Sequence, residues 1–140
     1  YCDFDRNFAF GPVADVARRA HDLVHSATEA GIAAARPGRS AGDVWRAIAA
    51  ELGEEAVRGA SVGRMGHGMG LALTEPPSIH PNDTTVLEPG MVITIEPGMA
   101  YAADGGRRIM VHEENVVVAE DGAPLLLTVR APPAMPEIAG

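Results

Sequence analysis

Cysteine is nearly absent from this chain of 140 residues: Cys2 is the single one, so no disulfide can form within the chain and no Cys-x-x-Cys pair exists. This usage fits a reducing compartment and excludes zinc sites built from thiolates. Long apolar runs are also missing, the longest being Met91 to Ile95 and Leu125 to Leu127, far short of the ~20 residues that span a bilayer. We therefore expect a cytoplasmic protein without a membrane segment.

Positive charge is the second shortage. Lys and Arg number 11 against 19 Asp and Glu, which gives a net charge of -8. This is the wrong sign for binding a phosphate backbone, and no basic stretch stands out, so we expect no nucleic-acid partner. The length and the 46% hydrophobic content suit one domain with a buried core.

The two ends of the chain carry further expectations. Residues Tyr1 to Phe10 form a strand-like run that begins without an initiator Met or a leader. We interpret this as the C-terminal part of a larger protein. The segment Ala131 to Gly140 contains three Pro and little else, and we expect it to form a loose tail.

Two amphipathic helices are predicted in the first half. After Pro12, apolar residues recur at three- and four-residue spacing up to Pro37-Gly38, which predicts one helix with a buried face. Ser40, with Asp43 three residues later, offers an N-cap for a second, shorter helix that ends before Gly53.

From Gly63 the pattern becomes that of a sheet, with glycines and prolines between runs of Val, Ile, Leu and Thr. Strands are predicted near Gly68 to Leu73, Met91 to Glu96, Ile109 to Ala119 and Leu125 to Val129, with turns that include Pro76-Pro77. This element order indicates an α+β fold.

Polar residues occur where apolar strand residues or close backbone approach are expected; they are Asp3, His67, Glu96 and Glu113. Alternation along a strand places Glu96 on the face of Val92 and Thr94. An ionised carboxylate on such a face needs a cation, a raised pKa or a metal. One imidazole and three carboxylates are a reasonable ligand set for Mn, Co, Zn or Fe.

Other interpretations compete at several of these positions. His67 could be a simple loop histidine, and Glu113 would face solvent if the strand register shifted by one residue. His21 and His25 stand four apart on the first predicted helix, a possible metal pair without an acidic third ligand, and we expect a solvated or partly buried face there. The glycines around His67 do not complete either phosphate-binding pattern.

Five motifs follow one another along the chain. They are Tyr-x-Asp-x-x-Arg at Tyr1 to Arg6, Gly-His-Gly-x-Gly at Gly66 to Gly70, Glu-Pro-Pro-Ser-Ile at Glu75 to Ile79, Glu-Pro-Gly-Met-Val-x-Thr-x-Glu-Pro-Gly at Glu88 to Gly98, and Glu-Glu-Asn-Val at Glu113 to Val116. Together they resemble the pita-bread metallohydrolases, which include Xaa-Pro aminopeptidases, prolidases, methionine aminopeptidases and creatinase. The resemblance covers about Tyr1 to Leu127 and implies a pita-bread fold truncated at its N-terminus, with residues 1–130 as the C-terminal part of the catalytic domain.

The resemblance also implies a centre of two divalent metals held by two Asp, one His and two Glu, with a bridging water as nucleophile. By motif, Asp3 corresponds to the second Asp, His67 to the His, and Glu96 and Glu113 to the two Glu. The first Asp is not in this chain. Glu96 would also move the proton of the water, so Glu96 and His67 are the predicted catalytic residues. A homodimer is expected for the full-length protein.

Three departures separate the chain from the peptidases of this family. Thr74 stands where peptidases usually have a His, Val111 stands where proline-specific members often have an Arg, and Asp5 replaces a small residue. Thr74 and His80 are predicted to line the substrate pocket without touching metal.

The resulting interpretation is a metal-dependent hydrolase of a peptide or amide C–N bond, similar to Xaa-Pro peptidases and acting on a small peptide or amide. The alternative is a non-peptidase of the same fold, similar to ectoine hydrolase or to a dimethylsulfoniopropionate lyase. A third reading is an inactive relative that binds a partner, although all four ligand positions within the chain are intact. Fold alone does not decide among them.

Overall fold

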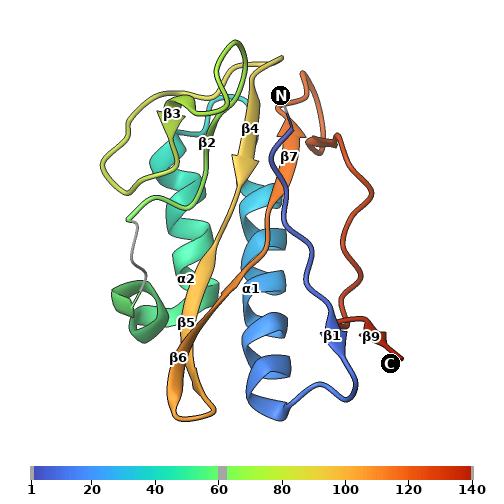
Figure 1. Ribbon diagram of the computed structural model, residues 1–140. Helices are drawn as coiled ribbons and strands as arrows, with labels where there is room; N and C mark the ends of the chain where they lie inside the picture. The colour runs from blue at the N-terminus through green and yellow to red at the C-terminus, as the bar shows by residue number, and fades with distance from the viewer. Residues whose placement is uncertain (1, 60–62, 140) are drawn as a thin grey trace.

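The computed structural model describes residues 2–59 and 63–139. Helix α1 (Asp15–Ala34) and helix α2 (Ala41–Gly59) lie side by side, with the strands in front of them (Figure 1). Within the described residues, neither helix combines the length and apolarity needed to cross a membrane.

Helix α1 confirms the predicted amphipathic pattern. Ala20, Val24 and Ala27 are buried, whereas Asp15 and Asp22 are exposed. The cap residue Ala35 donates its backbone N–H to the carbonyl of Gly31 at 3.1 Å. The buried stripe of α1 therefore faces α2 and the sheet.

Helix α2 begins with the predicted cap. The backbone N–H of Ser40 donates to Oδ2 of Asp43 at 2.9 Å, and the N–H of Asp43 donates to Oγ of Ser40 at 3.1 Å. These reciprocal bonds satisfy two donors at the helix start. Gly53, where the helix was predicted to end, has a non-helical φ of 77° and kinks the helix. Helical residues continue beyond it to Gly59.

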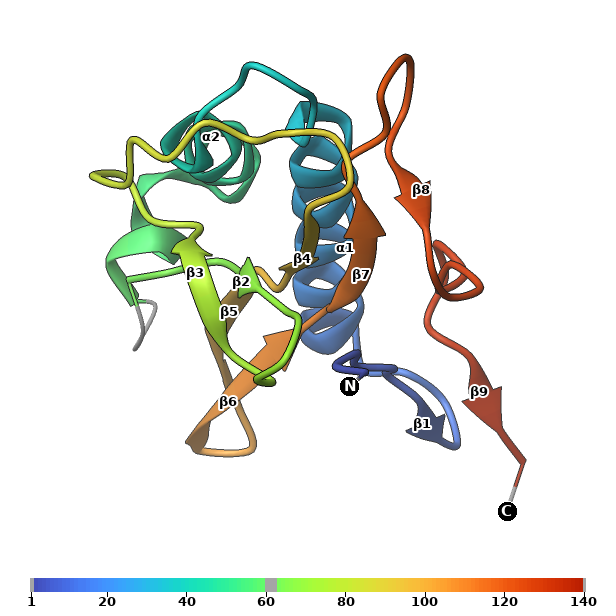
Figure 2. The same cartoon turned by 90° about the horizontal axis from the view of Figure 1, so that it is seen from above.

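The strands of the described chain are β1 (Ala9–Phe10), β2 (His67–Gly68), β3 (Glu75–Ser78), β4 (Val92–Ile95), β5 (Gly98–Ala103), β6 (Gly106–Val111), β7 (Glu114–Val117), β8 (Leu125–Leu126) and β9 (Glu137–Ile138). A five-stranded sheet has the order β3-β2-β4-β7-β8, while β5 pairs with β6 and β1 with β9. Figure 2 shows the two helices on one side of β4 and β7.

The structure differs from the predicted strands in several places. The predicted strands Gly68 to Leu73 and Leu125 to Val129 are reduced to the short β2 and β8, and β5 and β9 were not predicted. The opening run contributes only β1, and the predicted strand Ile109 to Ala119 is split into β6 and β7 around His112 and Glu113. Pro76-Pro77 lies inside β3 rather than in a turn. The break between β6 and β7 matters most, because it falls at a predicted ligand.

The C-terminal segment, which we expected to be loose, is attached to the rest of the fold. Ala9 pairs with Glu137 in the parallel β1–β9 ladder, and Met135 belongs to the main hydrophobic core. Met135 in the core and the pairing of β9 with β1 hold this segment in place, although its proline content had suggested a flexible tail.

The core lies between the helices and the central strands. Ile93 and Ile95 of β4 are fully buried, as are Val24 of α1 and Ile48 of α2. Burying side chains of this size stabilises a fold by about 1.5–3 kcal/mol each. This packing fixes β4 and its neighbours, and the candidate site is built at their ends.

Candidate metal site

The register of β4 and β7 brings two carboxylates together. The strands are antiparallel with Ile95 opposite Glu114. Glu96 follows β4 and Glu113 precedes β7, so both side chains leave the sheet at the same end of one strand pair. The sequence led us to expect both residues in one centre but did not predict the pairing of β4 with β7.

His67 is held on the neighbouring strand by close backbone approach. Strand β2 lies between β3 and β4, and a Cβ on Gly66 would overlap the backbone oxygen of Thr94, while one on Gly68 would overlap that of Pro76. Gly66 also has φ 144°, which favours glycine. The glycines flanking His67 are therefore required by packing.

The ring of His67 is oriented by its own neighbour. Nδ1 lies 2.9 Å from the carbonyl oxygen of Gly68, and because a carbonyl only accepts, Nδ1 carries the proton of the neutral ring. Nε2 then carries no proton, and its lone pair is available to bind a cation. It lies 3.6 Å from Oδ2 of Asp3 and 4.0 Å from Oε1 of Glu96.

Asp3 reaches the site from the N-terminal segment. Figure 1 shows this segment running beside β7, and Asn7 donates from Nδ2 to the carbonyl of Val111 at 2.6 Å. Side-chain contacts of this kind, rather than a strand ladder, hold residues 2–8. Within residues 2–10, only Ala9–Phe10 form a strand.

Three predicted ligands converge. Each of Asp3, His67 and Glu113 offers a donor atom, and these atoms lie within 4.8 Å of one another; no other group of three such residues in the described chain meets this condition. Glu96 borders the group through His67 and also contacts Nε of Arg64 at 3.4 Å. All four predicted ligand positions thus lie in one region.

The electrostatics of this group fit a cation. Burial, together with the charges of Asp3 and Glu96, raises the pKa of Glu113 to about 8. Its Oε1 atom is buried and has no hydrogen-bond partner within the described structure. A buried carboxylate that has one unpartnered oxygen and is surrounded by other acids is stabilised when a divalent ion binds.

Thr74 and His80 lie on the chain around β3. Thr74 is exposed just before β3, and His80 is partly buried just after it, where Nδ1 accepts from the N–H of Asn82 at 3.4 Å. Neither is in the group of three converging ligands. Their assignment to the substrate pocket stays a prediction.

His21 and His25 belong to a ring cluster with His112. His25 is partly buried, within the solvated or partly buried face that we expected, whereas His21 is fully buried and the expectation is wrong for it. The ring centroids of His21 and His25 lie 4.6 Å and 5.4 Å, respectively, from the ring of His112. His21 and His112 are fully buried. Burial, reinforced by the neighbouring His21, lowers the pKa of His112 to about 3, so the ring of His112 is neutral at pH 7. Burial also lowers the pKa of His21.

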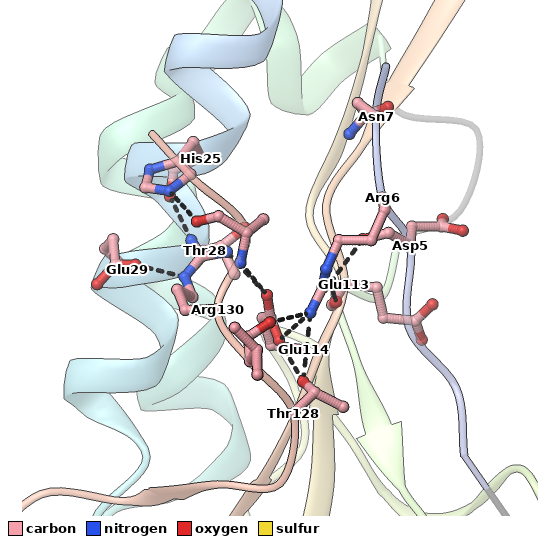
Figure 3. A network of polar contacts seen from close by, with 12 residues as sticks. Asp5, Arg6, Asn7, His25, Thr28, Glu29, Glu113, Glu114, Thr128 and Arg130 are labelled. Atoms are coloured by element: carbon pink, nitrogen blue, oxygen red, sulfur yellow. Dashed lines mark hydrogen bonds and ion pairs between the residues drawn. The ribbon is translucent and has the colours of Figure 1, made fainter. Parts of the chain in front are cut away.

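Sequence reasoning missed an ion-pair network beside the site (Figure 3). Glu114 is fully buried and contacts both Arg6 and Arg130. Burial alone would raise the pKa of Glu114, but hydrogen bonds from Thr128 and from the backbone of Ala131, together with the two arginines, lower it overall. Arg6 was visible as the last residue of the first motif, whereas Arg130 had no sequence signal.

Comparison with known proteins identifies the class of fold first. The dipeptidase PepE of Mycobacterium ulcerans superposes with a TM-score of 0.86 at 30% identity, covering 99% of this chain and 36% of that structure. The chain has the pita-bread fold of these proteins.

The sequence comparison then gives the family. Residues 1–121 match metallopeptidase family M24, and the chain belongs to this family. It is 38% identical over 124 residues to a probable dipeptidase PepE of Mycobacterium tuberculosis and 38% identical over 122 residues to an Xaa-Pro dipeptidase of Pyrococcus furiosus. The alignments cover 88% and 86% of this chain but only 32% and 34% of those relatives.

Proposed function

We propose that the protein containing this chain is a metal-dependent hydrolase that cleaves a peptide or amide C–N bond, with Asp3, His67, Glu96 and Glu113 as metal ligands. The observation that carries the proposal is the convergence of Asp3, His67 and Glu113 within 4.8 Å. The M24 match and the dipeptidase names of the relatives support the reaction class.

Divalent ions at these residues, two in the complete enzyme and chosen from Mn, Co, Zn and Fe, would polarise the scissile carbonyl and lower the pKa of a water nucleophile. The chain's own groups would do the rest. Glu96 would accept the proton of the attacking water and pass it to the leaving nitrogen. His67 would hold its Nε2 toward the site because Nδ1 is bound to the carbonyl of Gly68.

Substrate binding would involve the segments on either side of β3. Thr74 and His80 would contact a small peptide or amide, and proline-containing dipeptides are the substrates to test first, given the Xaa-Pro dipeptidase relatives. We further expect the full-length enzyme to be a cytoplasmic homodimer that binds no nucleic acid.

Metal titration tests the proposal. Isothermal titration of the purified protein with Mn²⁺ and Zn²⁺ should give saturable binding that Glu113→Gln weakens by at least tenfold. Glu88→Gln, which changes an exposed carboxylate outside the site, is the matched control and should leave binding unchanged. Equal affinities in the wild type and Glu113→Gln would refute the site.

Product analysis separates hydrolysis from the lyase alternative. Thr74 in place of the peptidase His is a departure from the peptidases, so both an ectoine-hydrolase-like and a lyase-like reaction stay open. A hydrolase incorporates one oxygen of the solvent into the product, whereas a lyase consumes no water. Turnover in ¹⁸O-labelled water followed by mass spectrometry therefore decides between the two reactions. A protein that binds metal but transforms neither class of substrate would support the inactive relative.

A further inference from the structure

We propose that Arg6 and Glu114 are positioning residues, whose ion pair sets the distance between the ligands Asp3 and Glu113. This inference rests on the proposed metal site. It concerns residues that touch neither the reacting atoms nor the metal, and it assigns them a role beyond fold stability.

Glu114 is a hub whose carboxylate is bound on both oxygens. Oε2 accepts from Nη2 of Arg6 at 3.1 Å and from Oγ1 of Thr128 at 2.7 Å. Oε1 accepts from Nη1 of Arg130 at 3.0 Å and from the backbone N–H of Ala131 at 3.2 Å. Because the side chain is fully buried, this geometry leaves it little freedom to move.

Arg6 connects this hub to the ligand Glu113. Its Nη1 donates to the backbone carbonyl of Glu113 at 3.1 Å, while Nη2 binds the carboxylate of the next residue, Glu114. The same guanidinium also donates to the carbonyl of Val129 at 2.7 Å. Figure 3 shows Arg6 reaching from the N-terminal segment to this point.

The other ligand, Asp3, is three residues from Arg6 on a segment that needs such an anchor. Residues 2–8 belong to no strand, so no backbone ladder fixes them. Beyond Arg6, the polar contacts of this segment with the described sheet region are few. They are the Asn7 bond to Val111, a 3.6 Å contact from Asn115 to the sulfur of Cys2, and the 3.6 Å approach of Asp3 to His67 within the proposed site. The planar fork of Arg6 is therefore the main bridge between the two ligand-bearing segments.

The sign of the effect distinguishes positioning from simple electrostatics. Arg6 is a positive charge close to a proposed cation site, so removing it should strengthen cation binding if charge alone mattered. If Arg6 instead holds Asp3 opposite Glu113, removing it should weaken binding, because one ligand loses its place.

Arg130 provides a matched control. It binds the same Glu114 carboxylate, but its other contacts are to Glu29 and to the backbone of His25 on α1. Arg6→Met and Arg130→Met each remove one guanidinium from the hub, and only Arg6→Met releases the segment carrying Asp3.

The test compares Mn²⁺ affinity, by titration calorimetry, with the unfolding temperature in a chelator. We expect both variants to lose a similar amount of thermal stability, and Arg6→Met to bind Mn²⁺ at least tenfold more weakly than Arg130→Met. Arg6→Lys, which keeps the charge but not the fork, should give an intermediate affinity. If the Met variants do not fold, Arg6→Lys and Arg130→Lys replace them in the same comparison.

The outcomes separate this inference from the proposed function. Equal affinity losses in the paired variants, or tighter binding in Arg6→Met, would overturn the positioning role while leaving the metal site intact. Absence of Mn²⁺ and Zn²⁺ binding in the wild type, or binding that Glu113→Gln does not alter, would overturn the metal site itself.

Discussion

Glu113 and Glu114 are consecutive and both buried, yet their carboxylates lie in opposite electrostatic surroundings. Glu114 faces the guanidinium groups of Arg6 and Arg130, whereas Glu113 faces other carboxylates. The pKa of Glu114 is lowered and that of Glu113 is raised to about 8. The chain thus compensates one buried acid with two arginines and places the other among acids, where the proposed metal ion would compensate its charge.

Stability without metal should depend on the ionisation of Glu113. Since folding raises its pKa from 4.5 to about 8, its contribution is complete below the unfolded pKa and is lost as pH rises toward 8. In a chelator, wild-type protein should lose on the order of 3 kcal/mol between pH 5 and 9 relative to Glu113→Gln. Urea unfolding at the two pH values measures this difference.

Added Mn²⁺ provides the internal control for that measurement. By compensating the charge, the ion should remove most of the pH-dependent difference between the wild type and Glu113→Gln. Identical pH profiles of the two proteins in chelator would contradict the raised pKa.

The histidine cluster predicts a pH dependence of the opposite sense. His112 has its pKa lowered to about 3, so its contribution is present above the unfolded pKa near 6.5 and is lost as pH falls. Lowering the pH from 7 to 5 should cost the wild type about 2 kcal/mol more than His112→Leu. Chemical unfolding at both pH values tests this.

A second histidine serves as the control. His80→Leu changes a histidine outside the ring cluster and should retain the acid sensitivity of the wild type. If His112→Leu is as acid-sensitive as the wild type, the buried cluster contributes nothing to the pH dependence.

Much of the site could be predicted from local sequence. Glu96 ends an apolar strand and His67 lies between glycines. In both cases the neighbouring residues alone were enough to single out the position as a candidate ligand. Glu113 was predicted as a ligand, but its place in the sheet was not predicted, because strand alternation fails around it: residues 112–115 are all buried. The break between β6 and β7 and the packing of His112 against α1 are tertiary effects that no two-residue period encodes.

Long-range partners could not be predicted for a related reason. The pairing of Arg130 with Glu114 depends on where the C-terminal segment crosses the fold, and its proline content suggested a loose chain. The start of α2 was easier to predict, because the Ser40–Asp43 cap is formed by residues three apart. Local chemistry was readable, whereas contacts between distant segments needed the structure.

The cap of α2 gives a direct stability prediction. Ser40→Ala removes the acceptor for the N–H of Asp43 and should lower the free energy of unfolding by about 0.5–2 kcal/mol. Ser26→Ala, at an exposed position inside α1, is the matched control and should not destabilise the protein, since alanine favours helix interiors. Equal effects of the two substitutions in urea unfolding would argue against the cap.

Substrate selection should be separable from metal binding at Thr74. Its side chain is exposed next to β3 and lies outside the converging ligands. Thr74→His would add an imidazole that can donate to a substrate oxygen or exchange a proton, which a hydroxyl does poorly near neutral pH. We therefore expect the ratio of kcat/KM between Xaa-Pro and other dipeptides to change by at least tenfold, with Mn²⁺ affinity within about twofold of the wild type. Thr84→His, at an exposed loop position after β3, controls for the added imidazole. A loss of Mn²⁺ binding in Thr74→His with unchanged dipeptide preference would mean that this position supports the metal site and does not contact substrate.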